Sequence, residues 1–219
     1  MIRALLLDLD GTLIHSEPVA AQALAEVFVK YGGSLPSDQA RAVIGRTWHS
    51  ALDLIDQKIG LPLPREQLLD EVLDLYRSRL LTHVAEVPGA AQAIHTLSQH
   101  FQIAVVSGSF REEIEAALNG LRVRDRISLV LGAEDYPQSK PSPDGYLKAL
   151  NHFGVRPSEA LIFEDSEAGM AAGLAAGSPV VAITHCSSVK RGSIWLSRVQ
   201  STIQDWSQVT PDWVRSFSE

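Results

Sequence analysis

The sequence predicts an α/β protein in which a doubly wound parallel sheet carries a small, all-helical insertion. From residue 87 onward, short apolar runs alternate with amphipathic helical stretches, which is the succession that builds a parallel sheet. Between the first apolar run and this region, residues 16–86 show helical periodicity and no convincing strand. We therefore expect a core domain of residues 1–15 and 87–219, interrupted by a helical domain of residues 16–86.

The first predicted strand is the apolar run over residues 4–7, and helices follow it. The first helix of the insertion places apolar residues at four-residue spacing and ends at the glycine pair Gly32-Gly33. Further helices of the insertion are predicted over residues 38–44, 50–59 and 65–83.

The second part of the chain supplies the remaining strands and the helices that connect them. Strands are predicted over residues 103–106, 127–131, 161–163, 180–183 and, at the edge of the sheet, 199–203. Helices are predicted over residues 89–99, 111–118, 143–152 and 167–176, with a short one from residue 211. Gly169, Gly173 and Gly177 recur every four residues, which we interpret as close packing of one helix face against the sheet.

Composition and charge exclude several classes of function. The net charge is −7 and Lys and Arg do not cluster, so the chain lacks the electrostatic footprint of a nucleic-acid-binding protein. The single cysteine, Cys186, excludes an internal disulfide, and the start of the chain does not resemble a signal peptide, so we predict a cytoplasmic location. The longest nearly uncharged stretch, residues 168–186, contains Pro179 and many Gly and Ala, so no membrane segment is expected.

Two carboxylates follow the first strand directly, in the sequence Asp8-Leu9-Asp10-Gly11. They therefore lie at the carboxyl edge of the sheet, where ligands bind in open α/β folds. Asp8 and Asp10 point to the same side if the extended conformation continues through Leu9. Because adjacent carboxylates resist joint ionisation unless a cation lies between them, the pair predicts a hard metal ion.

Polar residues recur where other predicted strands end. Ser107-Gly108-Ser109 follows the second strand, Lys140 lies in the loop after the third, and Glu164-Asp165 follows the fourth. Taken singly, each of these is typical of a turn, a loop or a helix cap. Together with Asp8 and Asp10 they predict one rim that binds Mg²⁺ through carboxylates and a phosphate group through Lys140 and a hydroxyl.

In order and spacing, these residues resemble the four motifs of the haloacid dehalogenase superfamily of phosphohydrolases. The first motif is Asp8-Leu9-Asp10-Gly11-Thr12, the second is Ser107, the third is Lys140 with Pro141 and Pro143, and the fourth is Glu164-Asp165. The resemblance covers nearly the whole chain. It implies a Rossmann-like core, with residues 16–86 as the helical cap found in the phosphatase and β-phosphoglucomutase branch.

The resemblance also implies catalytic roles. Asp8 would be the nucleophile that forms an aspartyl-phosphate, and Asp10 would be the general acid and then the general base. Charge on the transferring phosphoryl group would be met by Mg²⁺, Lys140 and the Ser107 hydroxyl. The residues expected to complete phosphate binding are Gly11 and Gly108, through backbone N–H groups, and Ser109.

A magnesium site is implied by the same resemblance. Its ligands would be Asp8, the main-chain carbonyl of Asp10, and Asp165. Glu164 would either bind the metal directly or support it through water, and the sequence leaves both options open. The partner would be a small phosphorylated metabolite, bound by a monomer or a weak homodimer.

Substrate choice is expected to depend on a cap loop containing Gly45, Arg46, Thr47 and Trp48. β-Phosphoglucomutases usually carry a histidine and an arginine where this chain has Ala20 and Trp48, so we favour hydrolysis of a small phosphate monoester, such as a sugar phosphate or a phosphoglycolate-like compound. A phosphosugar mutase is the main alternative. A non-catalytic phosphoacceptor module is a third possibility, disfavoured because such modules lack a cap.

Overall fold

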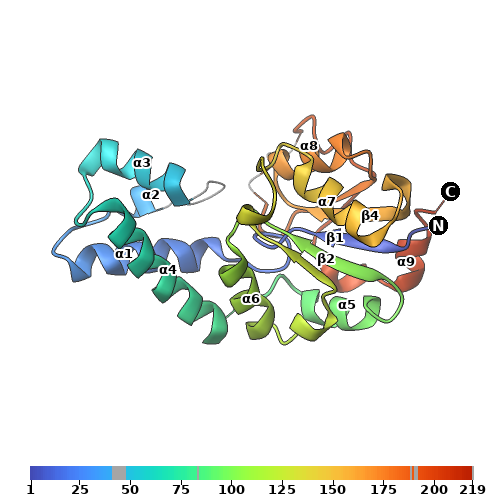
Figure 1. The fold of residues 1–219 in the computed structure, drawn as a ribbon, viewed down its shortest axis with the longest axis horizontal. Helices are drawn as coiled ribbons and strands as arrows, with labels where there is room; N and C mark the ends of the chain where they lie inside the picture. The colour runs from blue at the N-terminus through green and yellow to red at the C-terminus, as the bar shows by residue number, and fades with distance from the viewer. Residues whose placement is uncertain (41–47, 83, 188, 190–191, 219) are drawn as a thin grey trace.

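The protein, described here by a computed structural model, is built on a parallel sheet of six strands in the order β3-β2-β1-β4-β5-β6 (Figure 1). The structure describes residues 1–40, 48–82, 84–187, 189 and 192–218. The strands are β1 (Ala4–Leu7), β2 (Gln102–Val106), β3 (Leu129–Leu131), β4 (Ala160–Glu164), β5 (Val180–Ile183) and β6 (Ser201–Ile203). Because β1 pairs with both β2 and β4, it occupies the centre of the sheet. The order reverses beside β1, where open α/β sheets bind their ligands.

Helices cover both faces of the sheet, as the alternating pattern predicts. Helices α5 (Ala90–Leu97), α6 (Arg111–Gly120) and α9 (Pro211–Arg215) pack on one face, and α7 (Asp144–Phe153) and α8 (Glu167–Ala175) pack on the other. Along β1, Leu5 and Leu7 join the first hydrophobic cluster, whereas Ala4 and Leu6 join the second. Successive side chains of a strand point to opposite faces, so a completely apolar strand is the expected sequence for a sheet covered on both sides.

Helices α1 (Glu17–Lys30), α2 (Ser37–Ala40), α3 (Trp48–Ile59) and α4 (Arg65–Thr82) lie between β1 and β2 in the sequence and group together at one end of the molecule (Figure 1). The two connections between this group and the sheet run side by side. The His15 N–H donates to the Ala85 carbonyl at 2.6 Å, and the Val87 N–H donates to the Leu13 carbonyl at 2.9 Å. The division at residues 15/16 and 86/87 into core and cap stays a prediction.

Helix α4 also packs against α6 of the core. Gly120, at the end of α6, makes this contact possible, because a Cβ at that position would lie 2.2 Å from the carbonyl oxygen of Leu80. Only a glycine lets the two backbones approach this closely. The helical group is therefore joined to the core along a helix as well as through its two connections.

Several predicted elements differ in detail from the structure. The helix predicted over 50–59 begins at Trp48, and β3 is shorter than predicted because a 3₁₀ turn over Arg124–Arg126 precedes it. The helix predicted over 38–44 is described only up to Ala40. Among the residues that the structure describes, further 3₁₀ turns are Ala133–Asp135, Pro157–Glu159 and Trp206–Gln208.

The regularly spaced glycines Gly169 and Gly173 of α8, and Gly177 just after it, have different neighbours. A Cβ at Gly173 would lie 2.8 Å from Val180 on β5, which is the close sheet packing that the spacing predicts. Gly177 instead adopts a left-handed conformation with a φ of +82°, as glycines do after helix ends. Gly169 faces the carboxylate of Glu164, so its small size serves the site described below.

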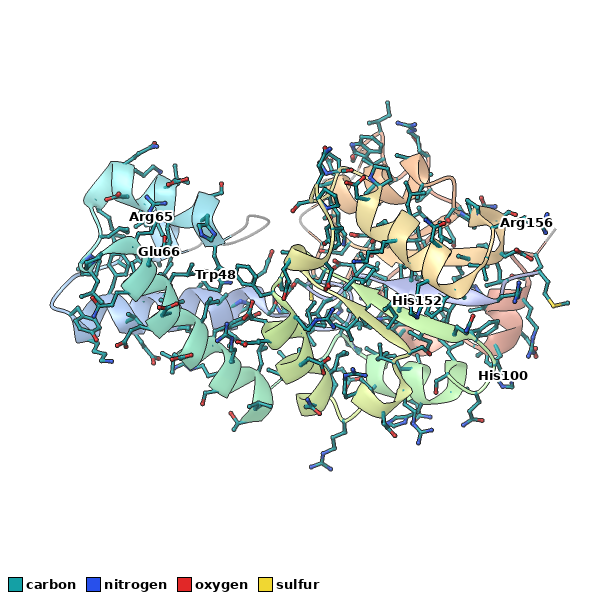
Figure 2. All side chains as sticks on the ribbon, viewed as in Figure 1. Trp48, Arg65, Glu66, His100, His152 and Arg156 are labelled. Atoms are coloured by element: carbon teal, nitrogen blue, oxygen red, sulfur yellow. The ribbon has the colours of Figure 1, made fainter. Side chains whose placement is uncertain are left out.

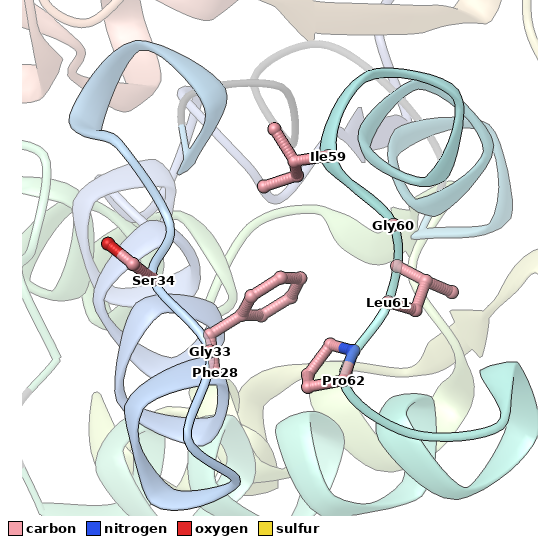
Figure 3. A pocket seen from close by; sticks show the side chains of 7 residues that line it. All are labelled: Phe28, Gly33, Ser34, Ile59, Gly60, Leu61 and Pro62. Atoms are coloured by element: carbon pink, nitrogen blue, oxygen red, sulfur yellow. The ribbon is translucent and has the colours of Figure 1, made fainter.

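A pocket of about 160 Å³ lies away from the sheet, between the segments that follow α1 and α3 (Figure 3). It is lined by Phe28, Gly33, Ser34, Ile59, Gly60, Leu61 and Pro62. None of these side chains is ionisable.

Among the residues that the structure describes, no helix has both the length and the apolar character needed to cross a bilayer.

Candidate active site

Asp8 directly follows the central strand, and its backbone is still tied to the sheet. Its N–H donates to the carbonyl of Phe163 on β4 at 3.0 Å, which places the side chain at the carboxyl edge. Its Oδ1 accepts a hydrogen bond from Lys140 Nζ at 2.5 Å. Burial raises the pKa of the Asp8 carboxyl; the charge of Lys140 opposes this shift and the charge of Glu164 adds to it.

Lys140 bridges two carboxylates of different strands. Its Nζ lies 2.5 Å from Asp8 Oδ1 and 2.5 Å from Glu164 Oε1, and its ammonium lies 5.2 Å from the centre of the Tyr146 ring. Burial alone would lower the pKa of Lys140, but the charges of Asp8 and Glu164 outweigh it and keep the pKa well above its ordinary value. The ammonium is therefore charged, and both carboxylates hold it at the sheet edge.

Both oxygens of Glu164 are used by neighbouring donors. Oε1 accepts from Lys140 and from the Tyr146 hydroxyl, the latter at 2.7 Å. Oε2 accepts from the N–H groups of Asp165 and Ser166 and from the Ser166 hydroxyl. A Cβ at Gly169 would lie 1.8 Å from Oε1, so α8 can begin here only with glycine at that position. These contacts make Glu164 an anchor for Lys140.

Asp165 lies next to the turn that follows β1. A Cβ at Gly11 would lie 2.1 Å from Asp165 Oδ2, and Gly11 has a φ of +83°, so both space and backbone conformation require glycine. The Gly11 N–H donates to the Ile14 carbonyl at 2.7 Å within the turn, and its part in phosphate binding stays a prediction. Burial, followed by the charge of Asp8, raises the pKa of the Asp165 carboxyl well above its ordinary value.

Asp10 is held by three serine hydroxyls. Ser16 donates to Oδ1 at 2.5 Å, while Ser109 and Ser107 donate to Oδ2 at 2.8 and 3.2 Å. These residues come from the start of α1 and from the loop after β2. The carboxylate of Asp10 is therefore oriented by neutral donors, in contrast to that of Asp8.

The turn that follows β1 lies beyond both carboxylates. Strand β1 ends at Leu7, Asp8 keeps a hydrogen bond to β4 through its N–H, and the Leu9 carbonyl accepts the N–H of Leu13 at 2.8 Å. The turn itself covers residues 11–13. That Asp8 and Asp10 point to the same side stays a prediction, and their side chains have different hydrogen-bond partners.

The loop Ser107–Ser109 is fixed on both sides. The Tyr136 hydroxyl donates to the Ser107 carbonyl at 2.6 Å, and the Ser109 N–H donates to the Ser107 hydroxyl at 3.1 Å. Gly108 is different, because it is exposed and no atom lies within 4 Å of where its Cβ would be. The loop thus directs the hydroxyls of Ser107 and Ser109 at Asp10, and Gly108 between them is accessible to solvent.

Asp8, Glu164 and Asp165 form a cluster suited to a divalent cation. One oxygen from each of these three carboxylates lies within 4.8 Å of the others, and all three residues are buried. The charge of Glu164 adds to the raised pKa of Asp8 and of Asp165, so a cation beside them would stabilise their charged forms, and oxygen ligands suit Mg²⁺. The residues present therefore fit such a metal, with Asp8 and Asp165 the better ligands because the oxygens of Glu164 already have donors.

The predicted cap residues are only partly described. Gly45, Arg46 and Thr47 lie outside the residues that the structure describes. Trp48 begins α3, on the side of the helical group that is nearer to the sheet (Figure 2). Its ring packs edge-on against Tyr76 of α4, with centroids 5.7 Å apart. Trp48 is therefore part of the packing between helices of the insertion.

Sequence reasoning missed several residues that shape this site. Tyr146 carried a usable signal, because it is the first buried side chain on the inward face of α7, six positions after Lys140. At the start of that helix, an inward side chain reaches the strand ends. Tyr136 and Ser16 carried no comparable signal, since their contacts depend on how two turns fold.

Comparison with known proteins gives a consistent result. The family model described as haloacid dehalogenase-like hydrolase matches residues 5–183. A bifunctional riboflavin kinase/FMN phosphatase of Arabidopsis thaliana is 31% identical over 81% of this chain, which spans only 47% of that protein. A fructose-1-phosphate phosphatase of Escherichia coli is 31% identical over 81% of this chain and 94% of its own.

A solved structure shares the fold. The crystal structure of CbbY from Rhodobacter sphaeroides in complex with phosphate superposes with a TM-score of 0.81. The superposition covers 95% of this chain and 96% of the other, at 20% sequence identity. At that identity the likeness concerns the fold.

Divalent cations should stabilise the protein through the carboxylate cluster. Mg²⁺ at a hundred times its Kd should raise the melting temperature by about 5–10 °C, because the ion binds the folded chain only. Differential scanning calorimetry should show that Asp165→Asn loses most of this increase. Asp135→Asn is the matched control, because Asp135 follows another strand end but pairs with Arg111. An equal increase in both variants would contradict the assignment.

Gly11 should matter for metal binding beyond its backbone strain. Gly11→Ala and Gly32→Ala both place a side chain at a positive φ, +83° and +76°, and this backbone strain should cost each variant about 1–2 kcal/mol of stability. Only Gly11→Ala adds a methyl group against Asp165, since nothing lies within 4 Å of a Cβ at Gly32. Titration calorimetry should show Mg²⁺ affinity reduced on the order of tenfold or more in Gly11→Ala alone. Equal affinities of the two variants would refute this role.

Proposed function

The chain belongs to the haloacid dehalogenase-like hydrolase family, and on this premise we propose that it hydrolyses a small phosphate monoester by way of a phosphorylated Asp8. The observation that carries the proposal is the contrast between two neighbouring carboxylates. Asp8 is held by a buried ammonium beside further carboxylates, whereas Asp10 is held by serine hydroxyls. Beside the ammonium of Lys140, Asp8 is placed to approach an anionic phosphoryl group. Asp10, among neutral hydroxyls, is placed to exchange a proton.

A divalent metal, for which we propose Mg²⁺, would be held by Asp8 and Asp165, with the main-chain carbonyl of Asp10 as a further ligand and Glu164 in support. When bound, the metal would neutralise negative charge on the phosphoryl oxygens and allow Asp8 to approach them. The three-carboxylate cluster supports this choice of residues.

In the first step, a carboxylate oxygen of Asp8 bonds to phosphorus while the bond from phosphorus to the ester oxygen breaks. Asp10 gives its proton to that leaving oxygen, so the alcohol departs neutral. Lys140 balances charge on the phosphoryl oxygens from the position where it already contacts Asp8. In the second step, Asp10 takes a proton from water and the water oxygen bonds to phosphorus. The bond between phosphorus and the Asp8 oxygen breaks, so phosphate is released and the Asp8 carboxylate is restored.

The substrate class we propose is a sugar phosphate or a phosphoglycolate-like compound, as suggested by the fructose-1-phosphate phosphatase among the relatives. The helices of residues 16–86 would cover the bound substrate and exclude bulk water. A mutase must instead retain its phosphoryl group until a second hydroxyl arrives. The position where mutases usually carry a histidine is Ala20, a buried residue of α1, which supports hydrolysis.

Activity should depend on Mg²⁺ and on Asp8. Phosphate release from a panel of phosphate esters should require Mg²⁺ and stop when EDTA is added. Asp8→Asn should lower kcat by about 10⁴-fold or more, the scale expected when a covalent nucleophile is lost. Asp135→Asn, with its carboxylate at another strand end, should keep wild-type turnover.

The same assay separates the alternatives. Robust turnover in Asp8→Asn, or activity without a divalent metal, would refute the mechanism. With a hexose 1-phosphate, accumulation of the 6-phosphate without free phosphate would show a mutase. A long-lived phosphorylated Asp8 with negligible turnover would show a phosphoacceptor.

A further inference from the structure

We propose that Arg77 of α4 is a positioning residue for the loop Ser107–Ser109, and that it acts through the buried carboxylate of Glu113. The inference rests on the proposed function, because it concerns how Asp10 is oriented for proton transfer. It assigns a role to an ion pair that joins the helical insertion to the core.

Glu113 is a buried carboxylate with two separate tasks. Its side chain is 1% exposed, and its Oε1 accepts a hydrogen bond from Arg77 Nε at 2.7 Å. Its Oε2 accepts the N–H of Phe110, the residue that caps α6, at 2.9 Å. One carboxylate therefore connects α4 to the first turn of α6.

Phe110 is joined by a peptide bond to the loop Ser107–Ser109, which holds Asp10. Phe110 follows Ser109, whose hydroxyl donates to Asp10 Oδ2 at 2.8 Å, and Ser107 donates to the same oxygen at 3.2 Å. A shift of the Phe110 backbone would move the Ser109 hydroxyl with it. The chain of contacts thus runs from Arg77 through Glu113 and the loop to Asp10.

The ion pair is not needed to bring the two helices together. At the other end of α6, Gly120 already lies against the backbone of Leu80, and apolar side chains of both helices share one cluster. A buried ion pair is often replaceable by apolar residues without loss of stability. The pair instead orients the Glu113 carboxylate, because Arg77 Nε holds Oε1 while Oε2 accepts the Phe110 N–H.

Arg77 is further held by a second carboxylate, since its Nη1 lies 2.9 Å from Glu112 Oε2. Arg79 offers a matched control on the same helix. Its side chain has the same exposed fraction, 26%, and pairs with Glu26 of α1, inside the helical insertion. Loss of Arg79 removes an ion pair of α4 without touching Glu113.

Steady-state kinetics at a temperature where all variants are folded tests the proposal. Arg77→Ala should lower kcat about tenfold to a hundredfold, the effect of misplacing a reacting group, with KM within about twofold. Arg77→Lys should recover most of this loss, because an ammonium still pairs with Glu113. Arg79→Ala should keep the kcat of the wild type. Equal losses in Arg77→Ala and Arg79→Ala would overturn the proposal.

A double-mutant cycle tests the route. In a Ser109→Ala background, Arg77→Ala should lower kcat by much less than in the wild type, because the contact through which it acts is already lost. If Arg77→Ala lowered kcat by the same factor in both backgrounds, the route through Ser109 would be contradicted.

Hydrogen exchange gives a result that does not depend on turnover. The Phe110 amide should exchange on the order of tenfold faster in Arg77→Ala, as expected for one lost hydrogen bond. Its exchange rate should be unchanged in Arg79→Ala. Unchanged exchange in Arg77→Ala would overturn the positioning role. Absence of phosphatase activity in the wild type, with faster exchange in Arg77→Ala, would refute the proposed function and leave the structural link in place.

Discussion

The bridge from Lys140 to Asp8 and Glu164 is the interaction on which the rest of the site depends. It places an ammonium between two buried carboxylates, at 2.5 Å from an oxygen of each. Because Glu164 is the last residue of β4 and Asp8 follows β1, this contact also links the ends of two neighbouring strands. Tyr146 and Gly169 complete it, one by donating to Glu164 and the other by leaving room for it.

The sheet brings these groups together, but their hydrogen-bond partners differ. Parallel pairing of β1 with β2 and β4 aligns three strand ends at the point where the strand order reverses. At this edge Asp8 contacts the ammonium of Lys140, whereas Asp10 accepts hydrogen bonds from serine hydroxyls. Two carboxylates that are nearly adjacent in sequence thereby acquire different electrostatic surroundings, which is the condition for different roles in acid–base chemistry.

The sequence predicted the fold well because its signals are local and periodic. Fully apolar strands such as residues 4–7, separated by amphipathic helices, leave few arrangements other than a doubly wound sheet. The partners of the site were harder to predict. Gly169 repeated with a helical period and suggested sheet packing, yet it faces a carboxylate. The contact between Arg77 and Glu113 joins residues 36 positions apart through packing of two helices, which no local pattern encodes.

In the proposed reaction Asp8, and not Asp10, carries the phosphoryl group. Rapid acid quenching during turnover, followed by borohydride reduction and mass spectrometry, converts an aspartyl-phosphate to homoserine at the residue that was modified. Homoserine should appear at position 8, with unmodified aspartate at position 10. Homoserine at position 10, or at neither position while phosphate is being released, would contradict it.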